Sequence, residues 1–167
     1  IRTLATKILR SPKEISIAIA KPAAGIVQQA YVVFDSQKGE VLKHVLKTVP
    51  WKSMIIFAST KEVVKKLDGV FQRSGLKAKA FHSDLEQPER EEILRAFKNK
   101  QLNILIGTDV LSRGIDVEGI SLIINFDVPP DPEDYVHRIG RTARAETTGT
   151  AITLVNERDQ RKFSSIE

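Results

Sequence analysis

The chain concentrates positive charge in one eight-residue segment. The side chains concerned are His137, Arg138, Arg141 and Arg144. Like charges three or four residues apart on a helix repel by about 0.2–0.5 kcal/mol per pair, so this cluster needs an anion. Phosphate suits it, because each guanidinium presents a planar fork of donors and stays charged at any working pH. The alternative is a solvated arginine face neutralised by Asp131, Glu133 and Asp134.

A second polar segment, Ser59 and Thr60, follows the apolar run 54–58. Ser59 and Glu62 have the spacing of a capping box, which predicts that a helix begins there. Free amides at a helix start bind phosphate, although every helix has them. This segment by itself is therefore weak evidence for a binding site.

A third polar segment covers residues 82–90, where Pro88 and Glu89 indicate a first helical turn. Gln87 and Arg90 share one face of that helix. An amide and a guanidinium one turn apart can hold a nucleic-acid backbone, and a surface hydrogen bond between them is equally consistent with the spacing. His82 is interpreted as a structural loop histidine.

A fourth polar segment, residues 108–116, combines a hydroxyl, two carboxylates, an arginine and a glycine. Asp109 is suited to capping a short helix. Asp116 lies beyond the glycine, and a carboxylate there could accept hydrogen bonds from ribose hydroxyls. The cap and ligand interpretations both stay open, since aspartate is favoured in both settings.

The elements that must position these segments alternate along the chain. From residue 26 onward, short apolar or β-branched runs alternate with amphipathic stretches, which is typical of βα units and a parallel sheet. Apolar side chains at helical spacing indicate helices within 41–49, 63–71 and 93–97. Strands are expected at 26–34, 53–58, 77–81, 103–107, 122–126 and 149–155. We therefore expect an open α/β sheet with helices on both faces and ligands beyond the carboxyl ends of its strands.

Residues 1–25 do not fit this alternation. An amphipathic stretch ends at Ser11-Pro12, a short alternating run follows, and residues 21–25 are typical of a linker. We interpret 1–25 as the tail of a preceding domain with its linker, and 26–167 as one domain; an N-terminal helix and edge strand of the same domain is the alternative. The start at Ile1 also suggests a piece of a longer protein. The apolar stripe in residues 1–20 is expected either to lie on the surface of this domain or to pair with a second copy, which would make a dimer.

Composition narrows the class of protein. The 26 basic and 21 acidic residues give a net charge of +5, which permits nucleic-acid binding without demonstrating it. The lack of cysteine excludes disulfides and thiolate zinc sites, and three scattered histidines argue against a histidine metal site. Apolar runs are far shorter than the ~20 residues of a membrane helix. A cytoplasmic protein without membrane contact is expected.

Taken together and in this order, the polar segments resemble conserved motifs of the DEAD-box RNA helicases. Motifs IV, IVa, V and VI correspond to Ser53–Phe57, Gln87 with Arg90, Thr108–Asp116 and His137–Arg144. The resemblance spans residues 26–156 and corresponds to the second, C-terminal RecA-like domain of the family. It implies a RecA-like, mainly parallel sheet, similar to the fold of P-loop NTPases but without the P-loop.

The resemblance also implies roles for single residues. In that family the second domain closes against an N-terminal RecA-like domain with ATP and Mg²⁺ between them, and single-stranded RNA lies across both. Arg141 and Arg144 would be arginine fingers, which are worth ~10³ to 10⁵ in rate. Asp116 and Gly114 would hold the nucleotide, and His137 and Arg138 would link to the catalytic motifs of the first domain. The residues implied along the RNA path are Ser59, Thr60, Gln87, Arg90, Thr108 and Arg113.

Two sequence elements needed for ATP hydrolysis are missing. The chain has no Gly-x-x-x-x-Gly-Lys followed by Ser or Thr, and no Asp-Glu-Ala-Asp. Arginine fingers cannot support ATP hydrolysis without a carboxylate that binds magnesium and a residue that positions the attacking water. The sequence therefore predicts half of an ATP-dependent RNA helicase that is inactive by itself. The alternatives are a stand-alone nucleic-acid-binding module and a DNA-preferring helicase domain of the same superfamily.

Overall fold

The computed structural model describes residues 25–114, 117, 119–142 and 148–166. The expectations for residues 1–24, including dimerisation through 1–20, and for Asp116 and Arg144 lie outside these ranges.

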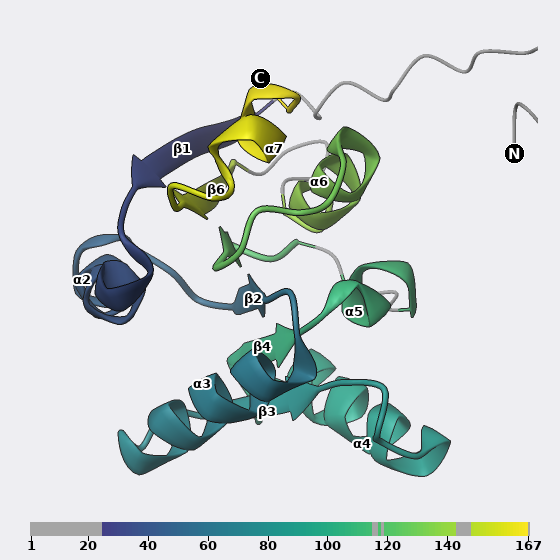
Figure 1. The fold of residues 1–167 in the computed structure, drawn as a ribbon. Helices are drawn as coiled ribbons and strands as arrows, with labels where there is room; N and C mark the ends of the chain where they lie inside the picture. Colours follow the sequence, from purple (N-terminus) through teal and green to yellow (C-terminus); the bar gives the residue numbers. More distant parts are fainter. Residues whose placement is uncertain (1–24, 115–116, 118, 143–147, 167) are drawn as a thin grey trace, which may run out of the picture.

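Within the described residues, six strands form one parallel sheet in the order β1-β6-β5-β2-β4-β3 (Figure 1). The strands are β1 (Ile26–Val32), β2 (Met54–Phe57), β3 (Ala78–Phe81), β4 (Ile104–Gly107), β5 (Leu122–Asn125) and β6 (Gly149–Val155). Strands β2, β4 and β5 are buried along their whole length, which explains their continuous apolar sequences. The predicted open parallel sheet and all six predicted strands are confirmed.

The helices divide between the two faces of the sheet. They are α2 (Lys38–Thr48), α3 (Lys61–Arg73), α4 (Gln87–Lys98), α5 (Asp109–Gly114), α6 (Pro132–Ile139) and α7 (Gln160–Ser164), with a short 3₁₀ turn η1 (Asp35–Gln37) before α2. Figure 1 shows α2 and α3 on one side of the sheet and α4, α5 and α6 on the other. The reason is topological: β1 to β2 to β3 crosses the sheet in one direction and the later connections return, so right-handed crossovers place the two sets of helices on opposite faces.

Two apolar cores follow from this arrangement, one on each face. On β2, Met54 and Ile56 pack toward α2 and α3, whereas Ile55 and Phe57 pack toward the other helices. All four side chains are fully buried. Successive residues of a strand point to opposite faces, so one four-residue strand supplies both cores.

Between residues 25 and 166, in the described part, no helix combines the length and apolar character needed to cross a membrane.

Two helix starts at the carboxyl edge of the sheet were predicted from the sequence, and the structure agrees with one of them. Helix α4 begins as expected, with Pro88 in its first turn and the Glu89 carboxylate accepting from the Glu86 backbone N–H at 2.8 Å. The predicted capping box of Ser59 is wrong. The N-cap of α3 is Thr60, whose hydroxyl accepts from the Val63 N–H at 3.3 Å. Ser59 is instead engaged by another loop, as described below.

A candidate nucleotide and nucleic-acid interface

The carboxyl edge of the sheet brings the polar segments together in an order that differs from their order in the chain. The strand order β5-β2-β4-β3 places the loops after these strands next to one another. Asp127, Ser59, Thr108 and His82 therefore follow neighbouring strands. Parallel strands all end at the same edge, so one surface collects residues from four separate parts of the sequence.

Arg138 lies inside the domain, with a side chain that is 1% exposed. Its Nε and one Nη donate to the two carboxylate oxygens of Asp109, at 2.7 and 3.1 Å. The other Nη donates to Asn125 Oδ1 at 3.2 Å and to the Asp127 carbonyl at 3.0 Å. The guanidinium carbon also lies 5.0 Å from the centre of the Phe57 ring. All three nitrogens of this cation therefore donate hydrogen bonds within the domain.

The sequence analysis expected Arg138 to link to the catalytic motifs of the first domain, and the structure shows its side chain buried among residues of this domain. The structure also settles the role of Asp109, for which the sequence left a cap and a ligand open. Asp109 is the first residue of α5, and both of its carboxylate oxygens bind the buried arginine. The ion pair joins α5 to α6 across the edge. It therefore fixes the start of one polar segment against the helix that carries another.

His137 and Arg141 lie on the outer side of the same helix end. His137 is exposed, Arg141 is partly exposed, and the Arg141 Nε lies 3.4 Å from the His137 carbonyl. The segment after α6 is anchored by Thr142, which is buried and donates to the Ile120 carbonyl. Asp131 caps α6 by accepting from the Asp134 N–H at 2.9 Å. Among the described residues of the cluster, Arg138 thus points inward, whereas His137 and Arg141 lie toward the surface.

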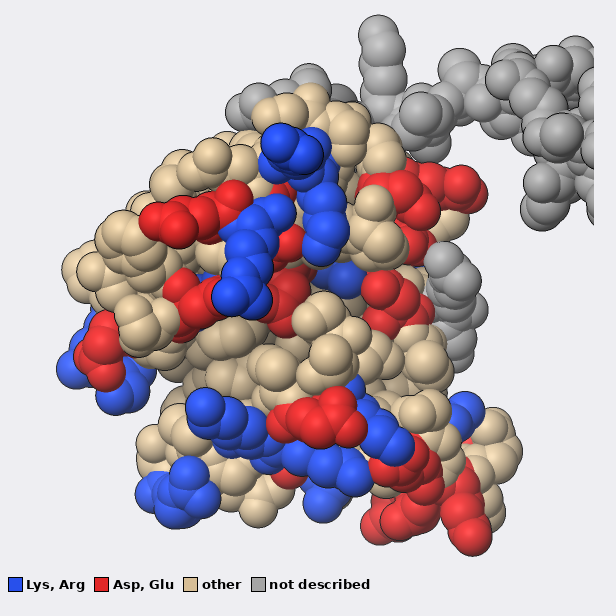
Figure 2. All heavy atoms as spheres, in the orientation of Figure 1, with Lys and Arg blue, Asp and Glu red and all other residues tan. Residues whose placement is uncertain are grey.

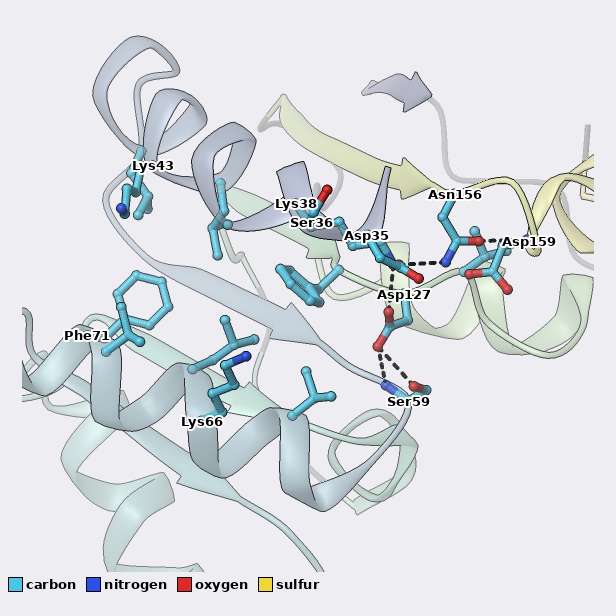
Figure 3. A pocket seen from close by; sticks show the side chains of 18 of the residues that line it. Asp35, Ser36, Lys38, Lys43, Ser59, Lys66, Phe71, Asp127, Asn156 and Asp159 are labelled. Carbon is cyan, nitrogen blue, oxygen red and sulfur yellow. Dashed lines mark hydrogen bonds and ion pairs between the residues drawn. The ribbon is translucent and has the colours of Figure 1, made fainter. Parts of the chain in front are cut away.

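Ser59 is held by Asp127, which follows the neighbouring strand (Figure 3). One Asp127 oxygen accepts from the backbone N–H and the hydroxyl of Ser59, at 2.8 and 2.9 Å. The other accepts from Lys38 Nζ at 2.8 Å. Burial opposes the charge of Asp127, but the bonds from Lys38 and Ser59 outweigh it and keep the pKa of this carboxyl below its ordinary value.

Lys38 is a site residue that the sequence analysis missed. It is only 2% exposed, its Nζ also lies 3.3 Å from Asp35, and it sits 5.4 Å from the Phe126 ring centre. The one available signal was its place as the first residue of a helix, where a cation opposes the helix dipole. A lysine at such a position points to a specific anionic partner.

The polar network continues beyond Lys38 to the end of β6. Asn156 donates to Asp35 at 2.7 Å and accepts from the Asp159 N–H at 2.8 Å. The bond from Asn156 is the main cause of a lowered pKa at Asp35. Lys162 Nζ then donates to Asp159 at 2.9 Å. Figure 3 shows this chain of contacts running from the Ser59 loop to the segment before α7.

Gln87 and Arg90 do not bond to each other. Gln87 donates to Glu91 at 3.0 Å, and Arg90 donates to the Ser83 carbonyl at 3.1 Å. Within the described ranges, the buried Arg90 Nε and Nδ1 of the buried His82 have no hydrogen-bond partner. Burial, reinforced by nearby lysines, lowers the pKa of His82. These contacts place Arg90 against the loop after β3.

Two lysines of α3 lie against that same loop. Lys61 and Lys65 bind the exposed Asp84 at 3.1 and 2.9 Å and hold its pKa at about 2. The loop after β3 is therefore attached to α3 by ion pairs at the surface.

Thr108 connects β4 to α5, and its carbonyl accepts from the Leu111 N–H at 2.9 Å. Gly107 permits this sharp turn, because a Cβ there would lie 2.9 Å from the Phe81 carbonyl and 3.0 Å from Leu111. Arg113 and Gly114 lie in the last turn of α5. Over the described ranges, no three His, Asp or Glu side chains gather where they could hold a metal ion.

The parallel sheet, its two helical layers and the polar loops at one edge define a RecA-like α/β domain. The profile of the helicase conserved C-terminal domain family matches residues 37–146. The chain belongs to this family, as the C-terminal RecA-like domain of a DEAD-box helicase.

Relatives of known structure or function share both sequence and fold with the chain. It is 38% identical to the ATP-dependent RNA helicase DeaD of Buchnera aphidicola over 167 residues, which are 100% of this chain and 28% of that protein. A structure of the Escherichia coli DEAD-box protein SrmB bound to RraA, the regulator of ribonuclease activity A, is 34% identical with a TM-score of 0.78, covering 84% of each chain. Saccharomyces cerevisiae Dbp5 bound to RNA and ADP BeF3 is 30% identical with a TM-score of 0.81, covering 99% of this chain and 44% of that one.

Proposed function

We propose that this chain is the second half of the motor of an ATP-dependent RNA helicase. It supplies arginine fingers to ATP held by an N-terminal RecA-like domain of the same protein, and it forms half of a groove for single-stranded RNA. The observation that carries the proposal is the Arg138–Asp109 ion pair, which fixes α6 so that Arg141 faces outward beside the polar loops. The similarity to yeast Dbp5, solved with RNA and ADP BeF3, supports this assignment.

On the nucleotide side, Arg141 and Arg144 stabilise the charge that develops on the γ-phosphate. Asp116 and Gly114 hold the ribose, and His137 contacts the catalytic motifs of the first domain. Arg138 is a positioning residue, because all three of its nitrogens donate hydrogen bonds inside this domain. Bound Mg²⁺ neutralises phosphate charge, and its ligands belong to the N-terminal domain. This chain alone does not hydrolyse ATP.

On the RNA side, the first-turn amides of α3 and the residues of the next two loops face the phosphate backbone. Helix N-termini have unsatisfied N–H groups that bind phosphate. Both donors of Ser59 are used by Asp127, so Ser59 positions this loop and Thr60 begins the contact surface. The other contacts come from Gln87, Arg90, Thr108 and Arg113. Closure of the two domains by ATP and RNA then bends the bound strand away from its complement.

The proposal is tested by Arg141→Ala in the full-length protein. We expect RNA-stimulated ATP turnover to fall by at least ~10³-fold, because a finger that acts in the transition state is lost. Affinity for single-stranded RNA should stay within about twofold, since Arg141 belongs to the nucleotide side. The matched control is Arg73→Ala, an exposed arginine at the far end of α3, which should leave turnover unchanged. Undiminished hydrolysis by the Arg141 variant would refute the finger assignment.

The choice of RNA over DNA is tested by titrating matched single strands. We expect tighter binding and faster turnover with RNA, and affinity for either strand should fall with salt with a logarithmic slope near −0.7 per phosphate contacted. Equal affinity and equal turnover with both strands would favour a DNA-tolerant helicase of the same superfamily. Binding of RNA with no ATP turnover by the intact protein would favour the stand-alone module.

A further inference from the structure

A long groove lies between α2 and α3 on the face of the sheet opposite α5 and α6. Figure 3 shows the two helices on either side of β2, with side chains from both pointing into the space between them. Its volume is about 1090 Å³. That is above the range of typical small-molecule pockets, which is roughly 300–1,000 Å³, so the groove suits a segment of polypeptide better than a metabolite.

The floor of the groove is apolar and incompletely covered. Leu42, Leu67 and Phe71 are buried in the core beneath it, as the apolar stripes of α2 and α3 require. A second set of large apolar side chains lies above this core and is only partly buried. These side chains are Leu46, Trp51, Val63, Val70, Leu76 and Phe126.

Trp51 contributes apolar surface to the floor, and its one polar group is already hydrogen-bonded. Its indole N–H donates to the Leu46 carbonyl at 3.2 Å, so the polar edge of the ring is already satisfied. The remaining carbon surface of Trp51 and the Leu46 side chain line the same groove. Burying such a surface against a partner is favourable at roughly 25 cal/mol per Å² of apolar area.

The rim of the groove is basic. Figure 2 shows lysine and arginine side chains over α3, beside α2 and over α7, with acidic side chains among them, around a hollowed strip of uncharged surface. Lys47, Lys66 and Arg158 line the rim and form no ion pair within 4 Å among the described residues, although Arg158 is near enough to Asp35 to help lower its pKa. The rim carboxylates, in contrast, are bound to Lys38, Asn156 or Lys162 in the network of Figure 3; they are Asp35, Asp127 and Asp159. The lining of the groove has six basic side chains against three acidic ones, so its net charge is positive. The basic side chains are Lys38, Lys43, Lys47, Lys66, Arg158 and Lys162.

We propose that this groove binds an acidic amphipathic helix of a partner protein. The partner places apolar side chains spaced i, i+3, i+4 and i+7 on the floor and directs its carboxylates to the lysines of the rim. Helix α2 has 11 residues. At 1.5 Å per residue it borders a groove of about 16 Å, the length of three helical turns.

Two other occupants fit less well. RNA would need exposed aromatic faces for base stacking, whereas Phe71 is buried and Trp51 is half-buried. Residues 1–24 of the chain itself contain five basic residues and one acidic residue, so the basic rim repels them. Charge complementarity thus favours an acidic partner.

The test uses a fluorescein-labelled 16-residue peptide with leucine or phenylalanine at i, i+3, i+4 and i+7 and mainly Glu and Asp elsewhere. Anisotropy titrations with the full 167-residue chain should show saturable binding that weakens with salt. The double variant Lys47→Glu and Lys66→Glu should weaken binding at least tenfold. The matched control is Lys79→Glu with Lys100→Glu, which changes the charge equally at exposed positions outside the groove and should change affinity less than twofold.

A variant in the apolar floor of the groove tests the proposal independently of charge. Leu46→Gln should also weaken peptide binding at least fivefold. Thermal unfolding, measured in parallel, shows whether the variant remains folded. Equal binding by the wild type, both charge variants and the floor variant would overturn the proposal. The proposal would also be overturned if single-stranded RNA competed with the peptide and if the rim variants weakened RNA binding as much as peptide binding.

Two further results would assign the groove to another occupant. If removing residues 1–24 tightened peptide binding tenfold or more, the segment of the chain itself would occupy the groove. If sedimentation showed self-association that Leu46→Gln abolishes, the occupant would be a second copy. Either result would reject the partner-helix proposal.

Discussion

Two buried cations at the same edge of the sheet are held in different ways. Arg138 is surrounded by Asp109, Asn125 and a backbone carbonyl, and it links α5, β5 and α6. Lys38 is shared between Asp127 and Asp35 and links α2 to the loops after β2 and β5. The guanidinium of Arg138 is a planar fork whose donors have fixed directions, whereas the ammonium of Lys38 is a compact point charge.

The difference follows from what each cation positions. Arg138 holds two helices in one orientation, which requires several directed bonds and leaves no alternative geometry. Lys38 neutralises two carboxylates, one of which, Asp35, is 59% exposed. The α5–α6 side of the edge is therefore fixed by a buried arginine. The Ser59 loop is fixed by the Asp127 carboxylate, which still accepts two hydrogen bonds from Ser59 when Lys38 is removed.

The largest effect is expected for Arg138→Met. Removing the guanidinium leaves Asp109 without its ion-pair partner and Asn125 without a donor inside the domain, which should cost about 3–5 kcal/mol in the free energy of unfolding. Urea unfolding followed by circular dichroism measures this. The matched control, Arg141→Met, should lose much less stability, since it changes a partly exposed side chain instead of a buried one. Equal losses for the two variants would contradict the division of the cluster into inward and outward cations.

A smaller effect is expected for Lys38→Met. Asp127 keeps both Ser59 donors, so the loss should be about 1–3 kcal/mol, below that for Arg138→Met. Hydrogen exchange of the Ser59 amide should speed up more than the global change in stability requires. The control is Lys43→Met, an exposed lysine on the same helix, which should leave Ser59 exchange unchanged. Unchanged exchange in the Lys38 variant would show that the lysine does not position the loop.

The smallest effect is a pH dependence at Asp127. Its folded pKa lies below the ordinary value of 3.8, so its charged form contributes stability that is fully present above that pH and is lost as the pH falls through the folded pKa. The wild type should therefore be more stable than Asp127→Asn at pH 7, and the difference should shrink below about pH 4. Urea unfolding from pH 7 to pH 2 measures this. A difference that stays constant over that range would exclude the charge of Asp127 as its cause.

Local sequence patterns were sufficient for the elements themselves. The continuous apolar run at Ile104–Gly107 and the helical spacing in Lys61–Arg73 predict β4 and α3, because burial of a strand or of one helix face depends on residues close together in the chain. The resemblance of the polar segments to helicase motifs also indicated the family. The exact helix start at Thr60 was missed, because Ser59 and Thr60 are both good caps and Asp127, 68 residues from Ser59, engages Ser59.

Which cation turns inward was decided only by the tertiary structure. Arg138 and Arg141 are the same residue type three positions apart, and nothing local distinguishes them. Asp109, 29 residues away from Arg138, and Lys38, 89 residues away from Asp127, meet their partners only after the sheet has ordered its strands as β5-β2-β4. The amino-acid sequence by itself determined the strands, the helices and the inventory of charges. Their pairing depended on folding, because an ion pair in the interior is set by distances between strands and helices that are remote in the chain.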